Sequence, residues 1–152
     1  MNKKVLLIED DKNKIEKIFD FLSNREIVIK ESFHGGVNEL KENLHEYDFL
    51  ILDMTIPMWE KGDNDFGGNY EQFGGERILR EMKRKKLILP TILFTMFDVF
   101  PTKEKNITFN ELNDIYKEKF SDFYVGGVHY NSNDENWKID MTELIKSIDG
   151  RY

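Results

Sequence analysis

Acidic side chains stand directly after two short apolar runs of the sequence. The run 5–8 is followed by Glu9 and Asp10, and the run 49–52 is followed by Asp53. Carboxylates a few ångströms apart repel each other, by about 1 kcal/mol per pair in water and by several times more when partly buried. A hard divalent cation such as Mg2+ relieves that repulsion, because it prefers oxygen ligands. If these acids converge, the edge of the fold that carries them needs a compensating positive charge.

The elements that would bring these acids together are strands. Two apolar runs are short and uninterrupted, as in strands buried on both faces of a sheet: 5–8 and 49–52. The segment 91–95, which has a threonine at each end, is predicted to be another strand. In an open parallel sheet, ligands bind outside the carboxyl ends of the strands, where the strand order reverses. Glu9, Asp53 and the hydroxyl of Thr95 would therefore meet at one edge.

Helical periodicity separates the strands. Apolar residues recur at helical spacing in five segments: 15–22, 37–44, 78–82, 112–116 and 144–148. Thr108 and Glu111 have capping-box spacing, which places the start of the fourth helix. Further strands are expected at 27–29 and 123–125. Five alternating strands and helices predict an α/β, doubly wound parallel sheet in one domain spanning 1–152.

This pattern resembles the receiver domains of bacterial response regulators, in the CheY-like superfamily, over nearly the whole chain. The resemblance rests on Leu-Leu-Ile-Glu-Asp-Asp at 6–11, on Leu-Ile-Leu-Asp-Met-Thr-Ile-Pro at 50–57, and on Thr95 at the end of the fourth strand. It implies a flavodoxin-like five-stranded sheet of order 2-1-3-4-5 with five helices.

The resemblance also implies a role for each site residue. Asp53 would accept a phosphoryl group in a two-component phosphorelay, and Thr95 would bond a phosphoryl oxygen. Glu9, Asp10 and Asp53 would hold Mg2+ together with the backbone carbonyl of Thr55. The donor would be a histidine kinase or phosphotransfer protein. The expectation is a stand-alone receiver without an output domain, which would signal through protein contacts, with a homodimer as one form.

One residue of the receiver pattern is missing. Receivers carry a lysine at the end of strand five, and aligning residues 122–128 with that segment places Gly126 and Gly127 there. A charge-assisted hydrogen bond contributes about 1.5 to 3 kcal/mol, so its loss would weaken the phosphorylated state, or the coupling of that state to the surface, about tenfold to a hundredfold. His129 could point inward instead. Three loop lysines could also replace it, although surface positions are favoured for all of these residues: Lys61, Lys103 and Lys105.

Other positions near the pocket also differ from the receiver pattern. Met96 stands where receivers have a small residue, with Phe97 behind it, so the pocket is expected to be crowded. The aromatic residue that reorients in many receivers would map onto Phe123 or Tyr124, with a plain core position as the alternative. An extension at 96–106 would remodel the signalling face.

The segment 58–75 is long and rich in glycine, whereas receivers make this connection in a few residues. It would form a lid over Asp53, a partner surface or a mobile surface loop. A partner surface would use its aromatic residues: Trp59, Phe66 and Tyr70. Asp63 and Asp65 lack the later glutamate of an EF-hand, and no Gly-Lys-Ser or Gly-Lys-Thr follows the glycines as in a P-loop.

Composition excludes several classes of partner. With 22 basic and 29 acidic residues, the net charge of -7 disfavours nucleic acid. The absence of cysteine excludes disulfides and thiolate metal sites and fits a cytoplasmic location. The apolar runs are far shorter than the roughly 20 residues that a membrane span needs, so no membrane association is expected.

Competing functions remain. A pseudo-receiver would keep the fold as a protein-interaction module without phosphorylation, in line with the missing lysine and Met96. An enzyme is not expected, because haloacid-dehalogenase-like phosphatases place a second aspartate where this chain has Thr55. A flavin phosphate is disfavoured by the acidic loop after the first strand.

Overall fold

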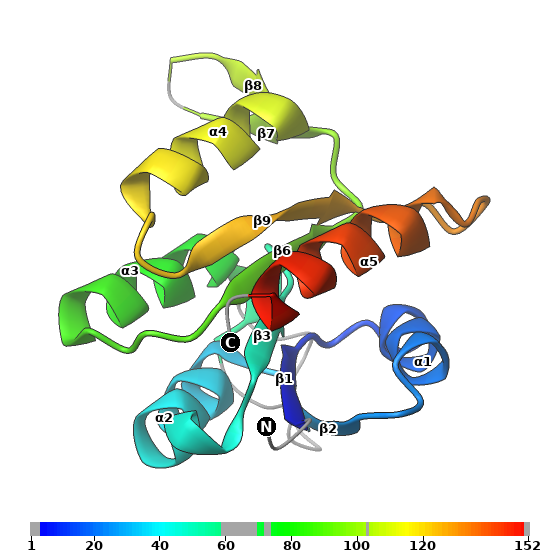
Figure 1. Cartoon of the computed structure of the whole chain (residues 1–152). Helices are drawn as coiled ribbons and strands as arrows, with labels where there is room; N and C mark the ends of the chain where they lie inside the picture. The colour runs from blue at the N-terminus through cyan, green and yellow to red at the C-terminus, as the bar shows by residue number, and fades with distance from the viewer. Residues whose placement is uncertain (1–3, 59–69, 72–73, 103, 151–152) are drawn as a thin grey trace, which may run out of the picture.

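The computed structural model describes residues 4–58, 70–71, 74–102 and 104–150. Its centre is a parallel sheet of five strands in the order β2-β1-β3-β6-β9 (Figure 1). The strands are β1 (Lys4–Ile8), β2 (Glu26–Lys30), β3 (Phe49–Leu52), β6 (Thr91–Thr95) and β9 (Tyr124–His129). The predicted α/β class and the order 2-1-3-4-5 are confirmed, because β6 and β9 are the fourth and fifth strands of this sheet.

In the described part of the chain, five α-helices alternate with the strands of this sheet, and they cover both of its faces (Figure 1). They are α1 (Lys12–Phe21), α2 (Phe33–Asn43), α3 (Gly74–Lys85), α4 (Phe109–Lys119) and α5 (Asn136–Asp149), with a short 3-10 helix at Leu44–Glu46. Alternate side chains of each strand enter different cores. Leu6 and Leu50 pack in the core with α2, α3 and α4, whereas Leu7 and Ile51 pack in the core with α1 and α5. The sheet is therefore buried on both faces, as its uninterrupted apolar strands require.

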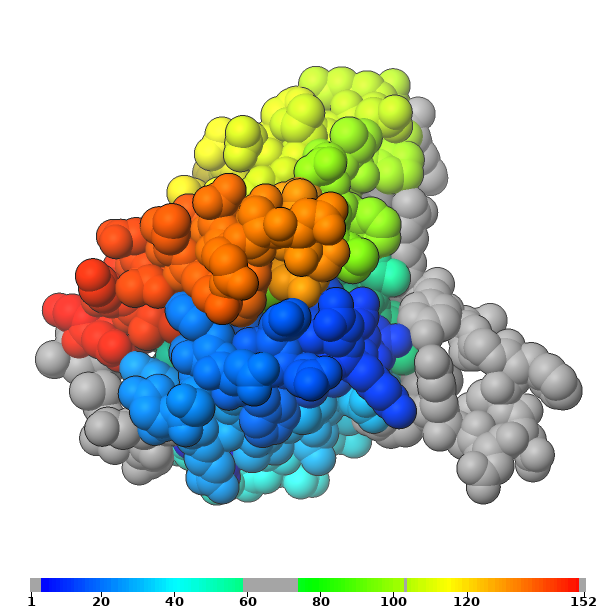
Figure 2. All heavy atoms as spheres, turned by 90° about the vertical axis from the view of Figure 1, so that its right-hand side faces the viewer, coloured from blue at the N-terminus to red at the C-terminus, as the bar shows by residue number. Residues whose placement is uncertain are grey.

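Asp11 is the N-cap residue of helix α1. Its side chain accepts hydrogen bonds from the backbone N–H groups of Asn13 and Lys14. The inward face of α1 is the one that Ile18 and Leu22 indicated, except that Phe19 lies outside it and Lys14 lies within it. Ile18 is fully buried, but Phe19 is 42% exposed, and Lys14 is 1% exposed. Figure 2 shows α1 (blue) beside α5 (orange) on one surface of the molecule.

Two small hairpin-like pairings extend the fold. β7 (Val99–Pro101) and β8 (Asn106–Thr108) pair in antiparallel fashion between β6 and α4, within the extension noted in the sequence. Thr108 and Glu111 then form the predicted capping box of α4. β4 (Ile56–Pro57) pairs in antiparallel fashion with β5 (Tyr70–Glu71).

Most of the loop predictions lie outside the described residues. These include the lid over Asp53 and four named side chains: Trp59, Lys61, Phe66 and Lys103. Of the predicted partner surface, only the backbone pairing of Tyr70 with Pro57 is described. In the described part of the chain, no helix has the length and apolar character to cross a membrane.

Candidate functional site

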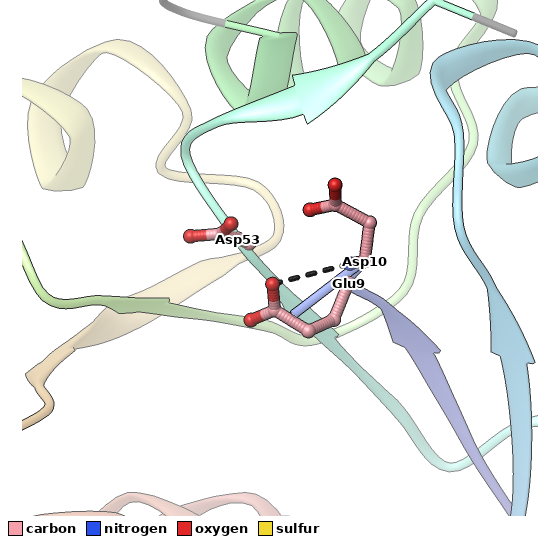
Figure 3. A group of neighbouring side chains, drawn as sticks. All are labelled: Glu9, Asp10 and Asp53. Atoms are coloured by element: carbon pink, nitrogen blue, oxygen red, sulfur yellow. Dashed lines mark hydrogen bonds between the residues drawn. The ribbon is translucent and has the colours of Figure 1, made fainter. Parts of the chain in front are cut away.

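Three carboxylates converge at the carboxyl edge of the sheet. One oxygen each from Glu9, Asp10 and Asp53 lies within 4.8 Å of the others (Figure 3). Glu9 is fully buried, Asp53 is 5% exposed, and Asp10 is partly buried. Three hard oxygen ligands in this arrangement suit a divalent cation.

The sheet register explains the convergence. Ile8 pairs with Leu52, so Glu9 and Asp53 are the residues that directly follow a paired position on neighbouring strands. The backbone N–H of Asp53 donates to Ile8 O at 3.0 Å, and the N–H of Glu9 donates to Lys30 O at 3.0 Å. The backbones that carry both acids are thus fixed by the ends of three adjacent strands.

Backbone N–H groups also hold the buried carboxylates. Glu9 Oε2 accepts from the N–H groups of Asp10 at 3.2 Å and Asp11 at 3.3 Å. Asp53 Oδ1 accepts from the N–H of Met54 at 2.8 Å. Hydrogen bonds of this kind favour the charged form of a carboxylate and offset part of the cost of its burial.

Lys14 is the site residue that sequence reasoning missed. Its ammonium Nζ lies 2.6 Å from Glu9 Oε1, as an ion pair without hydrogen-bond geometry, and donates a hydrogen bond to Asp53 Oδ1 at 3.0 Å. It also donates to the backbone carbonyl of Phe94 at 3.3 Å. A lysine from the first turn of α1 therefore places a positive charge between two of the acids.

A sequence signal for Lys14 existed. It precedes Ile18 by four residues and Leu22 by eight, so it lies on the same inward face of α1. A lysine on a buried helix face needs an anionic partner, because an unpaired buried charge is very unfavourable. The acids at 9 and 10 were the nearest candidates.

Burial and charge act in opposite directions on the ionisation of this cluster. Burial, together with the neighbouring charge of Asp53, raises the pKa of the Glu9 carboxyl to about 9, although Lys14 acts to lower it. Burial acts to lower the pKa of Lys14, but the carboxylates of Asp53 and Glu9 outweigh it and hold the pKa above its ordinary value. Lys14 therefore stays protonated at neutral pH.

A cavity of about 350 Å3 opens onto Asp53, and its lining includes Asp10, Lys14 and Thr55. Thr95 closes β6 beside β3 but is fully buried, and it is not among the lining residues. The hydroxyl of Thr95 accepts a hydrogen bond from the N–H of Phe97 at 3.2 Å.

The two bulky residues that were expected to crowd the cavity, Met96 and Phe97, lie at its outer wall. Met96 and Phe97 both line it, yet they are 51% and 46% exposed. They therefore form part of its wall at the protein surface rather than fill its interior.

The end of the last strand lies further along the chain than the sequence alignment placed it. β9 extends to His129, which pairs with Thr95, whereas Gly126 pairs with Ile92. The alignment that put Gly126 and Gly127 at the strand end was therefore wrong by about two residues. The pairing register of β6 and β9 also shifts between Thr91, which pairs with Tyr124, and Ile92, which pairs with Gly126.

The other candidates for the missing cation point elsewhere. His129 Nε2 lies 2.6 Å from Asp98 Oδ1, and its ring packs edge-on against Phe109. Lys105 Nζ lies 3.6 Å from Glu111 Oε2 at the start of α4. The surface role favoured for Lys105 is confirmed.

The candidate reorienting aromatics are core residues. Phe123 and Tyr124 are 2% and 5% exposed. Tyr124 pairs with Thr91, at the opposite end of β6 from Thr95, and its hydroxyl hydrogen bonds with Asn113 Oδ1 at 2.8 Å. Their alternative assignment to the core is confirmed.

No model of a known protein family matches the chain. Two curated proteins resemble it along their full length. An uncharacterized protein, y4jR, of Sinorhizobium fredii is 24% identical over 96% of this chain and 99% of its own. The Detocs response regulatory protein DtcB of Enterobacter cloacae is 24% identical over 94% of this chain and 99% of its own.

Solved structures show the same fold. A response regulator receiver domain protein of Clostridium thermocellum superposes with a TM-score of 0.62 at 19% identity, over 97% of this chain and 94% of that one. A Thermotoga maritima response regulator in complex with Mg2+ and BeF gives a TM-score of 0.57 at 20% identity, over 93% and 97%. CheY from a Borrelia burgdorferi complex with CheX gives 0.63 at 11% identity, over 95% and 87%. The chain therefore has the fold of the CheY-like response regulator receiver domains, as its acidic strand ends indicated.

Proposed function

We propose that this protein is a response-regulator receiver that accepts a phosphoryl group on Asp53. The observation that carries the proposal is the convergence of Asp53 with Glu9 and Asp10, within 4.8 Å, beside a cavity that reaches Asp53. The receiver fold supports a response-regulator function, and it is generally that of a signalling module rather than of an enzyme.

Asp53 would act as the nucleophile through Oδ2. Its described hydrogen bonds, from Lys14 and Met54, both fall on Oδ1, which fixes the orientation of the carboxylate. Attack on phosphorus forms an oxygen–phosphorus bond to Asp53 and breaks the bond to the donor, which leaves with its electron pair. The product is an aspartyl phosphate.

Glu9, Asp10 and Asp53 would hold Mg2+ together with the backbone carbonyl of Thr55, which lines the same cavity. When bound, the ion offsets the repulsion between the carboxylates and an anionic phosphodonor. The hydroxyl of Thr95 accepts from Phe97 N–H, so its own proton is available to a phosphoryl oxygen. Because Thr95 is fully buried, this contact requires the segment after β6 to shift.

The donor in this proposal is a histidine kinase or phosphotransfer protein, and the signal leaves through protein contacts. The resemblance to DtcB, a response regulatory protein, supports a role in signalling. The matched CheY structure is a complex with the protein CheX, which supports protein binding as the way in which the signal leaves this fold.

The test is incubation of the purified protein with acetyl phosphate and Mg2+, followed by intact-mass analysis. Wild type should gain one phosphoryl group, and Asp53→Asn should gain none. Asp10→Asn, which keeps the nucleophile and removes one metal ligand, should be phosphorylated much more slowly. A folded wild type that gains no phosphate from acetyl phosphate or from a phosphotransfer protein would contradict the proposal.

The pseudo-receiver remains the second candidate, and Lys14 favours it. Its ammonium already neutralises part of the acidic cluster, so the site can persist without metal or phosphate. If the protein is a pseudo-receiver, wild type and Asp53→Asn should bind the partner protein with equal affinity. Phosphate on wild type alone would exclude it.

A further inference from the structure

We propose that Lys14, on α1, supplies the ammonium that binds the phosphoryl group on Asp53. The receiver pattern places this cation at the end of the last strand, where the sequence alignment found glycine in this chain. The inference rests on the proposed function, because it assigns a residue to the same phosphorylated site.

The geometry of Lys14 is that of a group placed for this contact. Its ammonium lies 2.6 Å from Glu9 Oε1, 3.0 Å from Asp53 Oδ1 and 3.3 Å from Phe94 O. An ammonium has three donors, and three oxygens surround this one. Its side chain is only 2% exposed, so water screens these interactions weakly.

Lys14 also faces the space that a phosphoryl group would enter. It lines the same cavity as Asp53, Asp10 and Thr55. In the unmodified protein its partner is the Asp53 carboxylate. Once Asp53 forms the acyl phosphate, that carboxylate charge is lost, and the phosphoryl oxygens carry the negative charge a bond length or two away. A point charge on a flexible stem can follow this shift.

No other described residue can supply this charge from its present position. In the described ranges, Lys14 is the one basic side chain at ion-pair distance from Asp53 or Glu9. At the end of β9, His129 pairs with Asp98 instead. The strand end that would carry the cation in the receiver pattern therefore directs its basic group away from the acids.

A purely structural role for Lys14 makes a different prediction from a phosphate-binding role. Lys14 shares Glu9 and Asp53 with any bound Mg2+, so the two cations compete for the same oxygens. Removing Lys14 should therefore strengthen Mg2+ binding, because the cluster becomes more negative. It should at the same time shorten the lifetime of the phosphorylated protein. A residue that only keeps the site folded would weaken both properties when removed.

The experiment compares wild type with Lys14→Met, and uses Lys17→Met as the matched control. Lys17 is exposed on the same helix, so its variant should behave as wild type. Each protein is phosphorylated with acetyl phosphate and Mg2+, and its yield and decay are followed by intact mass. Because Lys14→Met loses one charge-assisted hydrogen bond to the phosphoryl group, the lifetime of its phosphorylated form should be about tenfold to a hundredfold shorter than that of wild type. Mg2+ affinity is measured by calorimetry with the metal alone and should increase.

A second pair of variants covers the case in which Lys14→Met does not fold. Glu9→Gln with Lys14→Met removes both charges of one ion pair and is compared with Glu9→Gln alone. The double variant should lose its phosphoryl group faster than the single variant.

The outcomes separate the two proposals. No phosphate on wild type would overturn both. Phosphate that is equally abundant and equally long-lived on wild type and on Lys14→Met would overturn only the assignment to Lys14. A loss of both phosphate lifetime and Mg2+ affinity would reduce Lys14 to a structural residue and overturn the assignment too.

Discussion

Each end of the sheet holds one cation between two carboxylates, in very different surroundings. At the carboxyl end, Lys14 lies between Glu9 and Asp53, and the three side chains are 2%, 1% and 7% exposed. At the amino end, Arg25 lies 3.6 Å from Asp48 and 3.1 Å from Asp149, with side chains that are 12%, 14% and 37% exposed.

The two clusters differ in what they can do. The guanidinium of Arg25 packs over the Phe49 ring at 5.2 Å and joins the segments before β2 and β3 to the end of α5. It is a planar, pre-oriented group suited to holding elements together. The ammonium of Lys14 sits beside a cavity and can reorient. Because a buried ion pair gives little net stability over apolar packing, the cluster at the carboxyl end is better explained by chemistry than by stability.

The largest expected effect comes from Lys14→Met in the absence of metal. Breaking a buried ion pair by removing one partner costs about 3 to 5 kcal/mol, because the remaining charge is uncompensated. Urea denaturation should show this loss in the free energy of unfolding, with Lys17→Met close to wild type. A loss below about 1 kcal/mol would mean that the two clusters are energetically alike.

Gly75→Ala should give the second-largest loss of stability, because the first turn of α3 packs closely against the backbone of Asp53. A Cβ at Gly75 would collide with the backbone carbonyl oxygen of Asp53 and lie 2.8 Å from Met54 Cα. The Gly75 N–H also donates a hydrogen bond to Met54 O at 2.8 Å. Overpacking of this kind costs about 1 to 3 kcal/mol. Thermal unfolding measures the cost, and slower phosphorylation of Asp53 should accompany it. An unchanged midpoint would show that this end of the sheet yields more readily than the contacts indicate.

Mg2+ should stabilise the carboxyl-end cluster by an amount that depends on Lys14. Binding to the folded state alone adds about 2.7 kcal/mol at a concentration one hundred times the dissociation constant. The gain should be larger for Lys14→Met than for wild type and small for Asp10→Asn. The measurement is the unfolding midpoint at increasing Mg2+, with Ca2+ as a comparison ion. If Mg2+ raised the unfolding midpoints of all three proteins equally, the ion would bind at a site other than the carboxyl-end cluster.

Arg25→Met should cost less than any change at the buried cluster. Its ion pairs are partly exposed, and pairs of this kind contribute about 1 kcal/mol or less. This loss of stability should disappear at high salt concentration, because dissolved ions screen partly exposed charges. Phosphorylation by acetyl phosphate should be unchanged. A defect in phosphorylation would show that the two ends of the sheet are coupled.

The smallest effect should be a pH dependence near the amino end. Burial acts to raise the pKa of Glu39, but hydrogen bonds from Tyr47 and Asn43 outweigh it and hold the pKa below 4.5. The folded state therefore gains stability above the unfolded pKa, and this gain is lost as the pH falls through the lower folded pKa. Tyr47→Phe should reduce this part of the acid sensitivity. Denaturation at a series of pH values below 5, compared with wild type, provides the check.

Local patterns were enough to predict the alternating strands and helices and the acids at the strand ends, whereas the strand order came from the resemblance to receiver domains. Each acid follows an apolar strand, and strands of a parallel sheet end at a common edge, so Glu9 and Asp53 could be placed without knowing any contact. Lys14 could not be placed in this way, because lysines are almost always exposed and its burial depends on Asp53, 39 residues away.

The end of β9 and the β7–β8 pairing were also beyond local patterns. The glycines at 126 and 127 interrupt the apolar run, so the strand seemed to end early. Both glycines are paired in the sheet, and a Cβ on Gly127 would lie 2.9 Å from the Phe109 ring. That close approach of α4 exists only in the folded chain. The β7–β8 pairing likewise depends on two short segments whose alternation is too brief to predict a strand.

The position of Lys14 concentrates the site in a short stretch of the gene. Residues 9–14 include two of the three acids, the cap of α1 and Lys14, whereas Asp53 and the proposed contacts of Thr55 and Thr95 are encoded elsewhere. A small cassette of residues 9–14 could therefore carry Lys14 and its two neighbouring acids into another chain of the same fold that already has an aspartate in the place of Asp53. A motif search for such sites should then look for a lysine five residues after the first acid, as well as for one on the last strand.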